Sequence, residues 1–116
     1  MSKATADVLE RLFTVIEKRR DADPDASYTA RLFGKGTQKL AQKLGEEAVE
    51  AVIAAVDGDK DALVEESADV LYHLLVLWAD RGVAPGDVFA ALEARMGVSG
   101  LEEKAARKRD DFGKRN

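Results

Sequence analysis

Apolar residues recur through most of the chain at the three- and four-residue spacing of an amphipathic helix. The first series consists of Val8, Leu9, Leu12, Phe13, Val15 and Ile16. Followed along the chain, this spacing predicts four helices, at about 5–20, 37–56, 60–81 and 85–96. We find no stretch that alternates apolar and polar residues as a strand does. The predicted fold class is therefore all-α, a bundle of about four helices per chain.

Capping and turn residues set the predicted boundaries of these helices. Thr37 is a suitable N-cap for the second helix. Residues 57–59, Asp-Gly-Asp, form a short turn before the third helix, which we expect to end at Gly82. Pro85 suits the first turn of the fourth helix. Residues 21–36 contain Pro24, Gly34 and Gly36 and are predicted to be a long, partly ordered loop.

The length of 116 residues predicts one domain, 1–116, with a helical core at about 5–97 and a charged C-terminal segment at 98–116. Apolar residues make up 46% of the chain, enough for a core, yet so small a domain buries its surface only marginally by itself. The stretch Val70–Ala79 is almost wholly apolar, and a helix that is apolar all round must be covered on every side. We therefore expect dimerisation to complete the bundle.

Charge and residue usage exclude several classes of function. The net charge of −4 argues against a general nucleic-acid binder. The absence of cysteine excludes a thiolate zinc site, and a single histidine makes a His-rich site improbable, so any metal should be a hard cation held by oxygen ligands. The N-terminus has no apolar segment typical of a signal peptide, and Val70–Ala79 is far shorter than the ~20 residues of a membrane span. We expect a cytoplasmic protein that binds no membrane.

Acidic residues gather on the second and third predicted helices. Because a short turn joins these helices, they should pair as an antiparallel hairpin. Counted outward from the turn, Glu50 then faces Glu66, and Glu47 faces Asp69 one turn further away. Such a cluster is either a solvated acidic face or a cation site.

Three features favour the cation site. Glu50 lies in a stretch that is otherwise apolar, Asp69 opens directly into an apolar run, and neither these two nor Glu66 has a Lys or Arg one turn away on its own helix. A carboxylate near a core is costly unless a cation or hydrogen bonds compensate its charge. Several carboxylates together indicate a multivalent ion, and Mg²⁺ is the usual one where phosphates are the substrate.

Basic residues and one histidine flank this cluster. Lys39 and Lys43 precede Glu47 on the same helix face, where Lys43 and Glu47 either form an ordinary ion pair or belong to a phosphate site. His73 lies one turn beyond Asp69, and a lone histidine is more often packed in the protein than catalytic.

These motifs together resemble a known family. Glu46-Glu47-x-x-Glu50 followed by Glu66-x-x-Asp69 resembles the signature of the all-α, MazG-like nucleoside triphosphate pyrophosphohydrolases. Within that superfamily, the longer context resembles the phosphoribosyl-ATP pyrophosphatases of histidine biosynthesis. This context consists of 27–32, 39–47, 69–73 and the C-terminal segment 97–107, and the resemblance spans about 8–109. Leu44 and Ser67 depart from the expected Val and Ala, at positions that do not bear on the proposed chemistry.

The resemblance implies hydrolysis of the α–β phosphoanhydride of phosphoribosyl-ATP, giving phosphoribosyl-AMP and pyrophosphate, by a homodimer with its sites at or near the interface. For the site it implies Glu47, Glu50, Glu66 and Asp69 as ligands of Mg²⁺, with Glu46 as the residue that orients or deprotonates the attacking water or as a further ligand. The residues expected to bind the substrate are Ser27, Tyr28, Thr29, Lys39, Lys43, His73, Lys104 and Arg107.

Two alternatives stay open at this point. One is a house-cleaning pyrophosphatase of the same superfamily that acts on dUTP, dCTP or damaged nucleotides. The other is a non-enzymatic helical dimerisation or adaptor module, which predicts exposed carboxylates and no bound metal, whereas the surroundings of Glu50 and Asp69 in the sequence predict burial.

Overall fold

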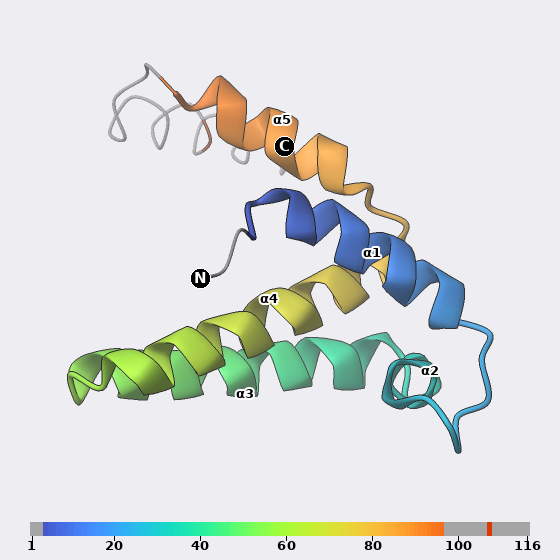
Figure 1. Ribbon diagram of the computed structural model, residues 1–116. Helices are drawn as coiled ribbons and strands as arrows, with labels where there is room; N and C mark the ends of the chain where they lie inside the picture. Colours follow the sequence, from blue (N-terminus) through green and yellow to red (C-terminus); the bar gives the residue numbers. More distant parts are fainter. Residues whose placement is uncertain (1–3, 97–106, 108–116) are drawn as a thin grey trace, which may run out of the picture. The chain divides into compact units, whose positions relative to one another are not determined.

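The computed structural model describes residues 4–96 and 107, and within them every regular element is a helix (Figure 1). The all-α prediction is confirmed. The helices are α1 (Asp7–Arg19), α2 (Tyr28–Phe33), α3 (Thr37–Val56), α4 (Lys60–Arg81) and α5 (Pro85–Ala94). The chain divides into two units, Met1–Pro85 and Gly86–Asn116, each of which is described by itself.

Helices α3 and α4 form the predicted antiparallel hairpin and pack along their length (Figure 1). Gly58 adopts a left-handed conformation (φ 74°) in the turn, and the Asp59 side chain caps α4 by accepting a hydrogen bond from the Ala62 N–H at 3.0 Å. At its other end, α4 stops at Gly82, whose φ of 71° is accessible to glycine at little cost. The bounds of both helices agree with the sequence prediction.

The predicted N-cap of α3 is wrong. Gly36 occupies the cap position with no side-chain hydrogen bond, and Thr37 is the first helical residue. The Thr37 hydroxyl donates instead to the Asp80 carboxylate at 2.6 Å, and this bond joins the start of α3 to the end of α4. Because Asp80 is 43 residues away, local sequence could not reveal this partner.

The predicted loop at 21–36 is also partly wrong, because it contains α2. The Ser27 hydroxyl accepts a hydrogen bond from the Ala30 N–H at 3.2 Å and so caps this short helix. A helix of six residues is too short to display a periodic apolar pattern. Its formation depends on burying Thr29, Ala30 and Leu32 against the other helices.

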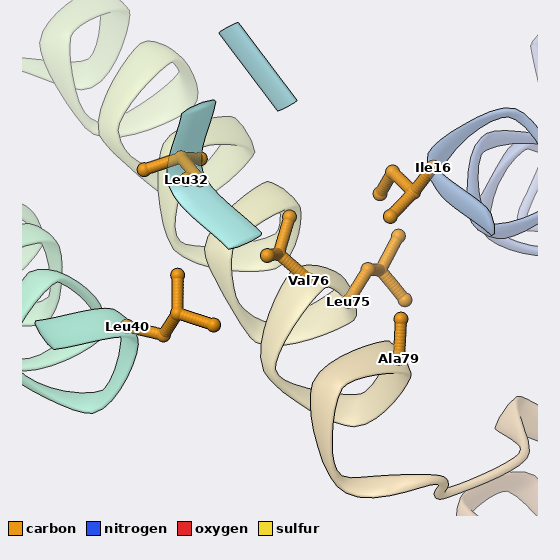
Figure 2. Close-up of a cluster of buried hydrophobic side chains, with 6 residues drawn as sticks. All are labelled: Ile16, Leu32, Leu40, Leu75, Val76 and Ala79. Atoms are coloured by element: carbon orange, nitrogen blue, oxygen red, sulfur yellow. The ribbon is translucent and has the colours of Figure 1, made fainter. Parts of the chain in front are cut away.

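The core of the first unit lies where α1, α2 and α3 meet the C-terminal half of α4 (Figure 2). Its fully buried side chains are Ile16, Leu32, Leu40, Leu75, Val76 and Ala79. The Arg20 side chain closes one side by donating to the Ala79 carbonyl at 2.8 Å and lying over the Phe33 ring at 4.9 Å. The packing holds α3 and α4 rigidly at the end of the hairpin away from its turn.

Part of the stretch Val70–Ala79 is buried by the chain's own helices. Leu75, Val76 and Ala79 are buried, and Leu71 is its exposed large apolar residue. The larger exposed apolar area lies nearer the hairpin turn, on α3. It consists of Val49, Val52, Ile53 and Val56, which we call the α3 apolar face; their three- and four-residue spacing places them on one side of the helix.

The second unit contains α5, which ends two residues before the predicted Met96. The C-terminal segment lies outside the described residues except Arg107, which is helical and exposed. Among the described residues, no helix has the length and apolar character that crossing a membrane requires.

Candidate active site

Three carboxylates converge between the two helices of the hairpin. One oxygen each of Glu47 on α3 and of Glu66 and Asp69 on α4 lie within 4.8 Å of one another. We call these three residues the carboxylate trio. Glu47 and Glu66 are half-buried and Asp69 is exposed. The hairpin register predicted from the turn thus brings Glu47 and Asp69 to the same level.

The geometry of the trio suits a magnesium ion. Oxygens bound to Mg²⁺ at about 2.1 Å in an octahedron lie roughly 3.0 Å apart when adjacent and roughly 4.2 Å apart when opposite. The trio comes within small side-chain adjustments of that spacing and would leave further positions for water and substrate oxygens. The fourth predicted ligand, Glu50, is not part of this group of converging oxygens.

Electrostatic repulsion is concentrated at Glu66. Partial burial, followed by the negative charges of Asp69, Glu47 and Glu50, raises the pKa of Glu66 above its usual value. The cluster therefore resists full ionisation in the protein by itself, and a divalent cation would relieve the repulsion.

The predicted burial of Glu50 and Asp69 is wrong, because both residues are exposed in the chain. The apolar neighbours that suggested burial for Glu50, Val49 and Val52, are themselves 56% and 60% exposed. An apolar sequence context indicates burial only when something covers the helix face that carries it.

Lys43 connects the trio to a cleft beside it. Its ammonium lies 3.3 Å from the Glu47 carboxylate, so the helix ion pair that the sequence allowed is present. Hydrogen bonding to Glu47 and the charge of that carboxylate raise the pKa of Lys43 above its usual value. Glu47 thus pairs with the Lys43 ammonium and also lies close to the carboxylates of Glu66 and Asp69.

The cleft has a volume of about 240 Å³ and is rich in lysine. It is lined by Tyr28, Leu32, Lys35, Lys39, Gln42, Lys43 and Glu46. Sequence reasoning found Lys39, Lys43 and Glu46 but missed Lys35, which lay in the predicted loop; the short helix α2 is what brings Lys35 to the cleft. The Gln42 amide donates to the Glu46 carboxylate at 3.0 Å, so Glu46 lies on the cleft side of α3 and outside the trio.

Residues 27–29, expected to bind the substrate from the predicted loop, form the start of α2. Ser27 caps the helix, and Thr29 is buried with its hydroxyl 2.6 Å from the Tyr72 hydroxyl. Tyr28 is 49% exposed and lines the cleft. Of these three predicted substrate residues, the structure brings the side chain of Tyr28 to the cleft.

His73 is packed, as is usual for a lone histidine. It is 6% exposed and lies edge-on to the rings of Tyr72 and Tyr28, with centroids 5.1 and 6.5 Å away. Burial is the main cause that lowers the pKa of His73 below its usual value, which favours the neutral form of the ring. The structure places it beneath Tyr28 and Tyr72 and not in the lining of the cleft. Lys104, in contrast, lies outside the described residues.

Comparison with known proteins gives one consistent result. A sequence model of the family described as "Phosphoribosyl-ATP pyrophosphohydrolase" matches residues 9–96. A phosphoribosyl-ATP pyrophosphatase of Azospirillum brasilense is 58% identical over 106 residues, which are 91% of this chain and 96% of that protein. The phosphoribosyl-ATP pyrophosphatase of Paramagnetospirillum magneticum is 61% identical over 86% of this chain and 92% of its own length. That of Parvibaculum lavamentivorans is 61% identical over 90% of this chain and 95% of its own length.

Proposed function

The chain belongs to the phosphoribosyl-ATP pyrophosphohydrolase family, and from this premise we propose that it hydrolyses the α–β phosphoanhydride of phosphoribosyl-ATP in a magnesium-dependent reaction. The family makes it a hydrolase of histidine biosynthesis. The observation that supports the finer chemistry is the carboxylate trio beside a lysine-rich cleft, joined through the Lys43–Glu47 ion pair.

Glu47, Glu66 and Asp69 would hold the ion, and Glu50 is retained as a fourth candidate because its charge acts on Glu66. When bound, Mg²⁺ supplies Lewis-acid polarisation of phosphoryl oxygens and stabilises the charge that develops on the departing pyrophosphate. Magnesium binds through a few carboxylates and completes its shell with water and substrate phosphates, which matches a group of three carboxylates of which Asp69 is exposed to solvent.

The remaining site residues bind and orient the substrate. Lys35, Lys39 and Lys43 line the cleft and would pair with phosphate oxygens, which fixes the polyphosphate beside the trio. Glu46 lies on the same side, held by Gln42, where it could take a proton from an attacking water. Whether Glu46 acts as that base or as a further ligand, it lines the same cleft as Lys43.

We also propose that the enzyme is a homodimer. The α3 apolar face is exposed in the single chain, with Val52 and Val56 60% and 80% exposed. Val64 and Leu71, seven residues apart on α4, add further exposed apolar area, 66% and 43%. Contiguous exposed apolar area of this kind is typical of a surface covered by a partner. The cytoplasmic location expected from the sequence stays a proposal of the same kind.

The two alternatives are weakened to different degrees. The exposure of Glu50 and Asp69 fits what an adaptor module predicts, but the family is one of hydrolases, which excludes a purely non-enzymatic role. A house-cleaning enzyme would require the same trio, so substrate specificity must distinguish it from an enzyme that acts on phosphoribosyl-ATP. The relatives that match over most of this chain carry the name phosphoribosyl-ATP pyrophosphatase, which favours the biosynthetic substrate.

The test is incubation with phosphoribosyl-ATP and Mg²⁺ while pyrophosphate release is measured, beside a panel of ATP, dUTP and dCTP. We expect turnover of phosphoribosyl-ATP far above the panel. We also expect a chelator to abolish this turnover and added Mg²⁺ to restore it, together with a rise in melting temperature, because an ion that binds only the folded state stabilises it. Full activity in excess chelator, or equal turnover of dUTP, would contradict the proposal.

A further inference from the structure

Tyr28 is an exposed aromatic residue in a cleft that is otherwise mostly basic and polar. It is 49% exposed although its neighbours Thr29 and Ala30 in α2 are buried at 4% and 3%. An exposed aromatic ring next to three lysines offers a flat face for a planar base and cations for phosphates, which is the combination that binds nucleotides without base pairing.

The Tyr28 ring packs against two aromatic residues of α4, Tyr72 and His73. Tyr72 on α4 lies nearly parallel to it, with an interplanar angle of 20° and centroids 6.3 Å apart. Buried His73 stands edge-on to both rings, so two neighbouring residues of α4 pack against the Tyr28 ring. Rings in such offset and edge-on arrangements attract each other.

One hydrogen bond fixes the position of Tyr72 relative to α2. The hydroxyls of Thr29 and Tyr72 lie 2.6 Å apart, between residues 43 positions apart in the chain. Thr29 directly follows Tyr28, so this bond fixes the first turn of α2, and with it the Tyr28 ring, against α4. The Ser27 cap fixes the same turn from its N-terminal end.

The cleft of about 240 Å³ is smaller than the roughly 300–1,000 Å³ of a pocket that encloses a whole drug-sized ligand. It therefore takes one part of a nucleotide and leaves the rest to the trio and to solvent. Lys43 lines the cleft and pairs with Glu47 of the trio, whereas Tyr28 of α2 lines the cleft from another helix.

We propose that Tyr28 is the stacking surface for the adenine of the substrate, and that Tyr72 and Thr29 are a positioning pair that holds Tyr28 in place. This inference rests on the proposed function only in taking the ligand to be an adenine nucleotide. Tyr72 itself does not line the cleft and acts through Tyr28.

The experiment compares Tyr72→Phe and Thr29→Val, which remove the hydroxyl bond, with a matched control. Thr37→Val removes an equally short hydroxyl bond of 2.6 Å, between α3 and α4, at a residue that does not line the cleft. Since a hydrogen bond contributes about 1 kcal/mol net, Tyr72→Phe should raise the KM for phosphoribosyl-ATP about fivefold with little change in kcat. Tyr28→Ala should raise it about tenfold or more. Thr37→Val should lower the melting temperature and leave KM unchanged.

A double-mutant comparison distinguishes a role of Tyr72 in positioning Tyr28 from a role in protein stability alone. In a Tyr28→Ala background, Tyr72→Phe should have no further effect on KM, because the ring that it positions is gone. A Tyr72→Phe effect of the same size in both backgrounds, or one matched by Thr37→Val, would overturn the inference.

A binding measurement makes the result independent of turnover. Calorimetric titration with AMP and with inorganic pyrophosphate should show that Tyr72→Phe and Tyr28→Ala weaken AMP binding and leave pyrophosphate binding unchanged. If the wild-type protein fails to hydrolyse phosphoribosyl-ATP, the proposed function is wrong, and these affinities still decide the role of Tyr28. Equal losses for AMP and pyrophosphate would show that no base-stacking surface exists.

Discussion

At the scale of single residues, Asp69 is the clearest test of the metal site, because its carboxylate converges with Glu47 and Glu66 although it is exposed. Asp69→Asn preserves its volume and removes the charge that a hard cation requires. We expect turnover to fall at least ~100-fold, on the scale of losing an electrostatic catalytic group, while the circular-dichroism melt stays near that of the wild type.

Glu65→Gln is the matched control for this variant, since Glu65 lies on the same helix, is exposed and is not part of the trio. It should retain near-normal activity. Glu50→Gln, measured beside it, reports whether Glu50 is a ligand in spite of its absence from the converging group. If the Asp69→Asn protein is folded and has normal turnover, the cluster is a solvated acidic face and not a cation site.

The charge on Glu66 should affect stability as well as catalysis. Its pKa is raised in the folded protein, so ionisation above the usual value near 4.5 disfavours the folded state. Glu66→Gln should therefore raise the melting temperature of the metal-free protein at pH 7, and this gain should shrink as the pH falls toward 4.5. Thermal melts at pH 7 and pH 4.5 measure it, and a Glu66→Gln protein that is less stable than the wild type at pH 7 would contradict the repulsion.

At the scale of elements, two glycines with open surroundings should respond oppositely to alanine. Gly82 ends α4 with φ 71°, and an added Cβ would meet no atom within 4 Å, so Gly82→Ala should cost about 1 kcal/mol through backbone strain alone. Gly45 lies inside α3, also without neighbours within 4 Å, and Gly45→Ala should stabilise by about 0.5–1 kcal/mol.

Denaturant titrations of both variants at one protein concentration provide this comparison. Each glycine serves as the control for the other, since both substitutions add the same methyl group in open space. Equal shifts of the same sign would mean that backbone conformation does not decide these positions.

At the scale of the whole molecule, the exposed α3 apolar face predicts self-association. Val52, 60% exposed, lies in that face, and Val52→Asp should shift sedimentation from a dimer toward a monomer or cause loss of folding at micromolar concentration. Val8→Asp, at an exposed apolar residue of α1 that is 41% accessible, is the control and should leave the dimer intact. A wild-type protein that sediments as a folded monomer would refute the dimer.

The sequence by itself determined the features whose physical causes are local. Helical periodicity over long segments, the Asp59 cap and the left-handed Gly82 determine α3 and α4 to the residue, and the short turn between them sets the register that brings Glu47 to Asp69. The motifs identified the family, and the comparisons confirm it.

Tertiary structure decided what depends on distant partners. Thr37 bonds Asp80 and Thr29 meets Tyr72, each across 43 residues, so neither the role of Thr37 at the start of α3 nor the helix α2 could be predicted correctly from neighbours in sequence. The same holds for exposure: Leu75, Val76 and Ala79 are buried among the chain's own helices, whereas Glu50, Val49 and Val52 are exposed. Periodicity states which residues share a helix face, but only the packing of the other helices determines whether that face is covered.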